Sequence, residues 1–405
     1  MDADRLAFVG GRVADADGTR RADVVVDVDS GTIVGVGADA VDSVDHDGHG
    51  SEGEGEIEIE TVDIDGKVLA PGLIDSHVHL MMDGRPDVAT VDAESREMLS
   101  YRAAANLRAT VEAGVTTVRD LGAPGTLALD AGHAVEAGVL SGPRVVACGR
   151  NVVMTGGHGH WFGREADGPA EVRKAAREQL KRGAGVVKCM ATGGVLTEGA
   201  VTGAPELTED ELSALVDAAA PTGVPTAAHA HGKAGIENAV RAGITSVEHG
   251  TFMDRETADL MAREGTYWVP TASALEGMVE NGVEAGIPEE AVGKAEDAQE
   301  RFERAWEHAI DAGVKIAMGT DAGTPFNFHG ENALREMELL VEYGLTPAAA
   351  LEAATATAAE LLGVEAGRLA EGYRADLLVL DADPNEDVTA WRGADAVYRG
   401  GDRVA

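Results

Sequence analysis

The chain has 405 residues, of which 44% are hydrophobic and only 4% aromatic, so any core is built mainly from Ala, Val, Leu and Ile. This length excludes a single small domain and favours either one large barrel with a minor domain or two to three ordinary domains. The formal net charge of −38 excludes nucleic acid as a favourable partner, and no apolar run approaches the ~18 residues of a membrane span. Two cysteines, Cys148 and Cys189, do not make a disulfide framework, which favours a reducing cytoplasm.

The excess of acidic residues predicts a protein adapted to salt. A charge of −38 destabilises a compact fold by self-repulsion in dilute buffer. At ~1 M salt the screening length falls to about 3 Å, which removes most of this repulsion. We therefore expect a halophilic, cytoplasmic protein; the alternative is an acidic surface with no dependence on salt.

The first 67 residues are expected to form part of a small β-domain. Short β-like runs at 6–9, 22–28 and 32–36 are punctuated by Gly and Asp. Residues 42–61 are rich in Asp, Glu, Gly and Ser, and we expect an exposed acidic insertion or a long hairpin there. His46 and His49 fall in this segment and are interpreted as surface residues.

From residue 68 onward, short β-like runs alternate with helical segments. Eight such runs predict an α/β fold with a (β/α)₈ TIM-like barrel, and a doubly wound sheet is the alternative. The helical segments include 94–113, 169–182, 208–220, 233–242, 254–264 and 289–312. The β-like runs are 68–76, 115–119, 144–148, 185–189, 224–229, 244–249, 266–270 and 314–319.

The C-terminal part departs from this alternation. Residues 346–362 predict an Ala-rich helix with Pro347 in its first turn, and residues 372–380 and 396–399 return to strand patterns. These strands resemble the N-terminal ones. We therefore infer that 1–67 and 365–405 form one composite β-sandwich domain, with the barrel, 68–364, inserted between them.

Polar residues gather where the predicted strands end, which is where barrel enzymes place their chemistry. Residues two apart on a strand share a face, so His77 and His79 can reach into one space, and two converging imidazoles suit a divalent metal. Each residue alone also has an ordinary interpretation, such as an exposed loop histidine or a turn aspartate. The full set is His77 and His79 after the first run, Lys188 on the fourth, His229 on the fifth, His249 on the sixth and Asp321 after the eighth.

Lys188 is unusual because it lies within an apolar run, residues 185–190. A buried ammonium group is costly and tends to lose its proton. A neutral lysine amine can react with CO₂ to give a carbamate, whose two oxygens could bridge two metals. The alternative is a lysine in an ordinary ion pair.

Further histidines are candidates for substrate binding. His158 and His160 lie in a Gly-rich loop after the third run, and with His231 they could bind a carboxylate or carbonyl oxygen of the substrate. A purely structural loop is the alternative. Arg164 could pair with a substrate carboxylate or form an exposed salt bridge.

Neighbouring residues receive structural interpretations. By strand alternation, Glu248 should point away from His249, and Cys189 should pack in the core opposite Lys188. His329 follows the last run and is interpreted as a structural residue near the pocket.

Together these motifs resemble the amidohydrolase superfamily, in the branch near imidazolonepropionase that includes metal-dependent Xaa-Pro dipeptidases of the prolidase type. The resemblance extends over nearly the whole chain. Its motifs are 71–79, 114–122, 155–160, 188–194, 228–232, 247–251, 319–325 and 375–380.

The resemblance implies a binuclear site, with zinc as the expected metal. One metal would be bound by His77, His79 and Asp321, and the other by His229 and His249. Carboxylated Lys188 and a hydroxide would bridge the two.

The same resemblance implies a hydrolytic mechanism. The bridging hydroxide would attack the amide carbonyl, and Asp321 would take its proton and pass it to the leaving amine. Imidazolonepropionase itself resembles a one-metal site without the lysine ligand, so Lys188 favours the two-metal dipeptidase type.

The leading hypothesis is therefore a metal-dependent amidohydrolase that cleaves a C–N amide bond, with dipeptides (Xaa-Pro or related) or another small molecule as substrate. The alternatives are a cyclic-amide or other small-molecule amidase and, with less support, a catalytically silent scaffold. The ligand set also suits manganese or cobalt. The family suggests a homo-oligomer.

Overall fold

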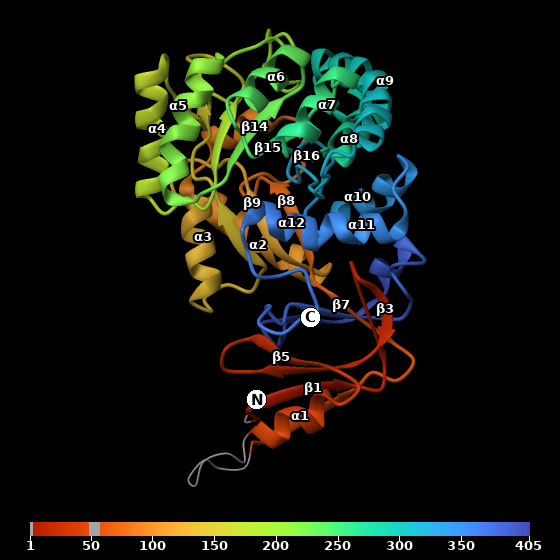
Figure 1. Cartoon of the computed structure of the whole chain (residues 1–405). Helices are drawn as coiled ribbons and strands as arrows, with labels where there is room; N and C mark the ends of the chain where they lie inside the picture. Colours follow the sequence, from red (N-terminus) through yellow and green to blue (C-terminus); the bar gives the residue numbers. More distant parts are fainter. Residues whose placement is uncertain (1–2, 48–56) are drawn as a thin grey trace.

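The computed structural model describes residues 3–47 and 57–405 (Figure 1). Parallel strands and most of the helices form one unit, and a smaller unit of mainly antiparallel strands lies below it in the view of Figure 1. Both ends of the described chain lie in the smaller unit (Figure 1). The predicted mixed α/β fold is confirmed.

The parallel strands form two sheets, with the orders β10-β9-β8 and β12-β11-β13-β14-β15-β16. Most of these strands are buried on both faces, as their apolar runs predicted. Their bounds are β8 Leu73–Val78, β9 Val115–Asp120, β10 Arg144–Ala147, β11 Val152–Val153, β12 Arg164–Glu165, β13 Val187–Met190, β14 Thr226–Ala230, β15 Ser246–His249 and β16 Tyr267–Val269.

The named strands do not form one closed sheet, so they do not confirm the expected (β/α)₈ barrel. The eighth expected run, 314–319, forms an isolated parallel bridge from Ile316 to Trp268, and Ala322, just after it, forms another with Val78. These bridges connect it to β16 on one side and to β8 on the other. Asp321 is thereby held beside the end of β8.

Helices connect and cover the parallel strands. The predicted single helix at 346–362 is divided at Thr355, where φ is −132° and ψ is −87°. The α-helices are α2 Arg96–Glu112, α3 Leu127–Glu136, α4 Pro169–Lys181, α5 Glu209–Ala219, α6 Lys233–Arg241, α7 Arg255–Glu264, α8 Ala272–Asn281, α9 Glu289–Ala312, α10 Glu331–Glu342, α11 Pro347–Ala354 and α12 Ala356–Leu362. Short 3₁₀ helices occur at Val88–Ala93, Ala220–Thr222, Val283–Ala285 and Val388–Gly393.

The smaller unit, here called the terminal β unit, combines strands from both ends of the chain. One sheet has the order β5-β4-β1-β6, and the other has the order β19-β18-β17-β7-β2-β3. Between them, the rings of Phe8 and Tyr398 pack edge to face, with centroids 4.9 Å apart. The domain boundaries at residues 67 and 365 stay predictions. The strands are β1 Arg5–Val9, β2 Arg12–Asp15, β3 Gly18–Arg21, β4 Asp23–Asp27, β5 Thr32–Gly37, β6 Ile59–Asp63, β7 Val68–Pro71, β17 Leu377–Leu380, β18 Ala394–Arg399 and β19 Asp402–Arg403.

The expected first strand of the barrel, 68–76, is two strands in two different sheets. β7 pairs with β2 and β17 in the terminal β unit, and the chain then passes through Gly72 into β8. A Cβ atom at Gly72 would lie only 2.2 Å from Oγ1 of Thr116, so the crossing requires glycine. The strand that carries His77 and His79 is therefore anchored directly in the terminal β unit.

The acidic segment 42–61 is only partly described. It begins within helix α1, Ala40–Asp47, rather than in a hairpin, and ends in β6. Residues 48–56, including His49, lie outside the described residues. The expected exposed insertion is therefore untested over these positions.

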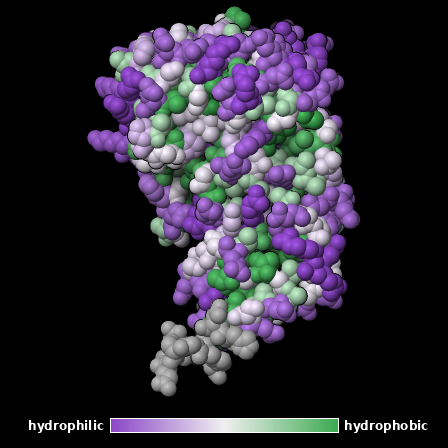
Figure 2. Space-filling model, viewed as in Figure 1, coloured by the Kyte–Doolittle hydropathy of each residue, from purple (hydrophilic) through white to green (hydrophobic). Residues whose placement is uncertain are grey.

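The surface view agrees with the composition. The face shown in Figure 2 is covered mainly by hydrophilic side chains. Across residues 3–47 and 57–405, no helix combines the length and the hydropathy that a membrane crossing needs.

Candidate metal centre

His77 and His79 lie at the end of β8 with their Nε2 atoms directed to one point. Nδ1–H of His77 donates to Oε2 of Glu248 at 2.9 Å, and Nδ1–H of His79 donates to the carbonyl oxygen of Gly122 at 3.0 Å. Because these acceptors hold the ring protons on Nδ1, the neutral rings present Nε2 as a lone-pair donor. This is the tautomer that a metal-binding histidine needs.

Asp321 completes the first group of potential ligands. Its Oδ1 lies 3.3 Å from Nε2 of His77 and 3.2 Å from Nε2 of His79. The backbone of Asp321 is left-handed, with φ of 61°, an uncommon conformation for a residue other than glycine. Such strain occurs preferentially at functional sites, and here it turns the carboxylate towards the two histidines.

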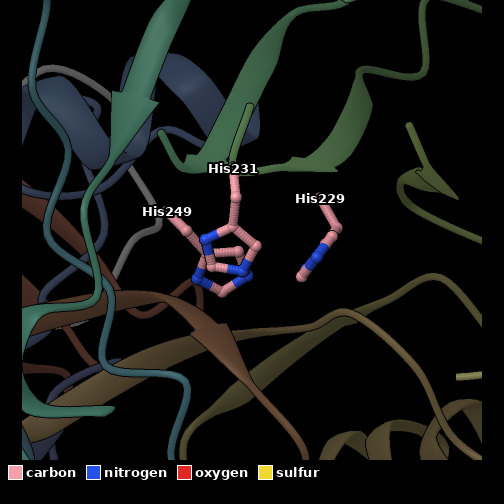
Figure 3. Close-up of side chains that lie close together, drawn as sticks. All are labelled: His229, His231 and His249. Atoms are coloured by element: carbon pink, nitrogen blue, oxygen red, sulfur yellow. The ribbon is translucent and has the colours of Figure 1, made fainter. Parts of the chain in front are cut away.

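His229, His231 and His249 form a second group from β14, the residue after it, and the end of β15 (Figure 3). One ring nitrogen from each lies within 4.8 Å of the others. The rings of His231 and His249 stack with centroids 4.9 Å apart. Nε2 of His229 is buried and has no hydrogen-bond partner among the described residues, so its lone pair is free to bind a metal.

Burial favours the neutral form of most of these histidines. It lowers the pKa of His229 and of His249 well below the ordinary value, and lowers the pKa of His77 to about 4. Burial also acts on His79, but hydrogen bonding and charge attraction to Asp321 outweigh it and raise the pKa of His79. Neutral imidazole is the form that binds a metal, so the groups suit a divalent cation such as zinc.

Lys188 lies on β13 and lines the same cavity as both groups. Its side chain is only 1% exposed, and it makes no ion pair with a carboxylate of the described residues. Burial therefore lowers the pKa of its ammonium group, despite the attraction of Glu248. The ordinary interpretation of an ion-paired lysine does not fit this position.

The sequence reasoning missed Glu248 and Arg119, which form a buried pair beside His77. Glu248 was expected to point away from His249, but both side chains contact His77. Oε2 of Glu248 lies 2.9 Å from Nδ1 of His77, and the ring centroids of His249 and His77 are 5.2 Å apart. The expected alternation of side chains along the strand fails because the backbone of His249 has φ of 67° and is not extended. Arg119, fully buried like Glu248, donates to its carboxylate at 2.9 Å.

The predicted substrate-binding histidines occupy different depths. His158 is buried, with its ring centroid 4.3 Å from that of His229, and its Nδ1 lies 2.7 Å from Oγ1 of Thr197. Burial lowers its pKa to about 3. His231 lies within the second ligand group. His160 is exposed and lines an outer hollow rather than the inner cavity.

Arg164 lies outside this cavity. Its guanidinium Nε donates to Oε2 of Glu178 at 2.9 Å, so the alternative interpretation, a surface salt bridge, describes its position. His329 is also outside the cavity, where its Nε2–H donates to the carbonyl oxygen of Met82 at 3.1 Å. This contact agrees with a structural role for His329.

The polar part of the cavity wall consists of the histidines, Lys188 and Asp321, with Thr251, Thr271 and Thr324. Its accessible volume is about 60 Å³. The remaining wall is mainly apolar and includes Met82, Val88, Trp161, Phe162, Leu275 and Met278. A few convergent polar groups in an apolar cavity are typical of a small-molecule site.

Comparison with known proteins identifies the family. Residues 68–404 match the Amidohydrolase family. The chain belongs to this family. Ochratoxinase from Aspergillus niger is 34% identical to it over 372 residues, covering 82% of this chain and 75% of the relative.

Two further relatives confirm the predicted branch of the family. Imidazolonepropionase from Streptomyces griseus is 26% identical over 407 residues, covering 93% of this chain and 95% of that protein. The solved structure of a Xaa-Pro dipeptidase with bound methionine in the active site is similar, with a TM-score of 0.87 and 32% identity, covering 98% and 99% of the two chains. This amidohydrolase is accordingly a hydrolase of C–N bonds.

Proposed function

We propose that this amidohydrolase is a binuclear metal-dependent dipeptidase that acts on Xaa-Pro or related dipeptides. The observation that carries the proposal is the convergence of two ligand groups and a buried, unpaired Lys188 on one cavity. We also propose that the two parallel sheets, together with the eighth run, form the (β/α)₈ barrel of the family.

In this proposal His77, His79 and Asp321 hold one cation, and His229 and His249 hold the other. A CO₂-derived carbamate on Lys188 would lie between them, and the neutral amine that this reaction requires is supported by the burial of Lys188. Zinc suits the nitrogen and oxygen donors. When bound, two such cations lower the pKa of water and polarise an amide carbonyl.

Asp321 is proposed to move the proton. Burial favours its neutral form, but the nearby His77 and His79 outweigh burial and lower the pKa of Asp321, so it is ionised at neutral pH. An ionised carboxylate can accept a proton from the attacking water and deliver it to the leaving nitrogen.

His158 and His231 are proposed to bind the substrate's carboxylate or carbonyl oxygen. Both rings are buried and lie beside His229, with centroids 4.3 and 4.7 Å from it. His160, in the outer hollow, would contact only the distal end of a substrate. We leave Arg164 out of the proposed site because Glu178 already pairs with it.

A cyclic-amide or other small-molecule amidase is the second candidate, favoured by the similarity to imidazolonepropionase over 93% of this chain. A silent scaffold has less support, because all six predicted ligands are present. We further propose, from the charge of −38 and the absence of a disulfide pattern, a halophilic cytoplasmic enzyme. By similarity to the family, it would be a homo-oligomer.

The test combines metal analysis with a substrate panel at high KCl. We expect about two metals per chain, and cleavage of Xaa-Pro dipeptides that a chelator abolishes. Lys188→Met should reduce the metal content, whereas Lys181→Met, at an exposed position, should not. If dipeptides were inert and lactams were cleaved, the second candidate would replace the first.

A further inference from the structure

Glu336 on α10 is a fully buried carboxylate that does not line the cavity. Its Oε1 accepts a hydrogen bond from N–H of Ala272 at 2.9 Å, and its Oε2 accepts one from N–H of Ser273 at 2.7 Å. These two residues form the first turn of α8, where the backbone N–H groups have no partner within the helix. Glu336 therefore clamps the start of α8 from a different helix.

The clamp is needed because Thr271, the residue before α8, does not cap the helix itself. Its side chain makes no capping hydrogen bond. Instead Oγ1 of Thr271 lies 2.7 Å from Nδ1 of His249. The backbone of Thr271 is left-handed, with φ of 56°, an outlier for a β-branched residue. Such a conformation persists only where surrounding contacts hold it.

Through Ser273, Glu336 is also connected to the other group of potential ligands, which contains Asp321. Oγ of Ser273 donates to the carbonyl oxygen of Thr320 at 3.1 Å, and Thr320 directly precedes Asp321. N–H of Thr320 is in turn held by the buried Asp75 at 3.0 Å. One turn, residues 271–273, thus contacts His249 directly and contacts Thr320, the residue before Asp321.

A carboxylate is an expensive group to bury for packing alone. Glu336 makes no ion pair with any described residue, and burial raises its pKa to about 7. A neutral side chain would fill the same volume without this penalty. Its two acceptor oxygens, which match the two N–H groups, account for the choice of glutamate.

We propose that Glu336 is a positioning residue of the metal centre: it fixes the turn 271–273, so that Thr271 orients His249 and Ser273 supports Asp321. The inference rests on the proposed function, because it concerns the metal ligands. Glu336 itself touches no reacting atom. Partners that orient a ligand in this way typically change metal affinity by 10- to 100-fold when they are removed.

The test measures zinc affinity by competition with a chelator, in protein shown to be folded by circular dichroism. Glu336→Gln preserves the size but leaves one acceptor oxygen, and should weaken zinc binding roughly tenfold. Thr271→Val removes the hydroxyl beside His249 and should weaken it similarly. Because both act through one chain of contacts, the double variant should be little weaker than the single ones.

Asp376→Asn is the matched control. Asp376 is another buried carboxylate that accepts a backbone N–H, from Gly400 at 2.9 Å, but it lies in the terminal β unit. Its substitution should lower stability and leave zinc affinity unchanged.

Wild-type zinc affinity in Glu336→Gln would refute the positioning role and leave the proposed function intact. Fully additive losses in the double variant would refute the route through Thr271. If Glu336→Gln does not fold, Thr271→Val still tests the proposal, because an unchanged zinc affinity in that variant overturns it. A wild-type protein that binds no zinc would instead refute the proposed function, and this inference with it.

Discussion

The buried pair of Glu248 and Arg119 allows a quantitative prediction. Both side chains are 0% exposed, and the guanidinium donates to the carboxylate at 2.9 and 3.1 Å. Glu248→Gln removes the negative charge and leaves the positive charge of Arg119 unpaired in the core. Breaking a buried pair in this way costs about 3–5 kcal/mol of unfolding free energy.

The pKa of Glu248 gives an independent magnitude. Burial opposes ionisation, but Arg119 and then His77 outweigh it and lower the pKa from 4.5 to about 2. A shift of this size corresponds to about 3 kcal/mol. Because the folded-state pKa is depressed, this contribution is complete above about pH 4.5 and is lost as the pH falls from there towards 2.

The assay is urea-induced unfolding in 1 M KCl, first at pH 7 and then at decreasing pH. Glu248→Gln should lose about 3 kcal/mol at pH 7, and the difference from wild type should narrow below pH 4.5. Glu97→Gln, at an exposed position with no ion pair to a described residue, should change stability by less than about 0.5 kcal/mol. Adding Arg119→Met to Glu248→Gln should recover part of the loss, because the unpaired charge is removed. A loss below about 1 kcal/mol for Glu248→Gln would refute this reasoning.

Three further predictions address the site and the surface. Asp321→Asn should keep the fold, measured by circular dichroism, but lower kcat at least ~100-fold, and near-normal turnover would exclude the proton-transfer role. Gly194→Ala places a Cβ atom 2.4 Å from the ring of His158 and should raise KM. Gly293→Ala adds a Cβ atom with no atom from outside its own helix backbone within 4 Å, so it should leave KM unchanged and stabilise α9 by roughly 0.5–1 kcal/mol. Equal KM values for the two variants would argue against His158 as a substrate contact. The unfolding free energy should rise as KCl increases from about 0.1 to 1 M, where the screening length falls from about 10 to 3 Å, and a flat salt dependence would contradict the halophilic interpretation.

The residues that converge at the candidate metal centre could be predicted because each lies within or directly after an apolar run. Hydrophobic patterns locate strands, and parallel strands end at one edge, so His77, Lys188 and His229 were expected together. The role of Glu248 could not be predicted, because alternation assumes an extended backbone and His249 has φ of 67°. Local pattern does not encode such a conformation outside glycine.

Long-range contacts explain the other omissions. Glu336 lies 65 residues after Thr271, and the sequence around it resembles that around any other glutamate in a helix. The sequence nevertheless contained one indication of this role. Glu336 shares the apolar face of α10 with Ala333, Met337 and Leu340, where a charged residue is unfavourable unless it has specific partners. The division of 68–76 into two strands depended on the steric environment of Gly72, which only the folded structure provides.

The anchoring of β8 through β7 has a consequence for biosynthesis. β7 pairs with β17, which the ribosome makes about 300 residues later. At roughly 5–20 residues per second, this separation corresponds to a delay of roughly 15–60 s. During this time the nascent chain exposes an apolar strand edge next to His77 and His79, two of the proposed metal ligands. We therefore expect C-terminal truncations before residue 377 to yield aggregation-prone protein rather than a smaller active enzyme, even though every proposed metal ligand would be present.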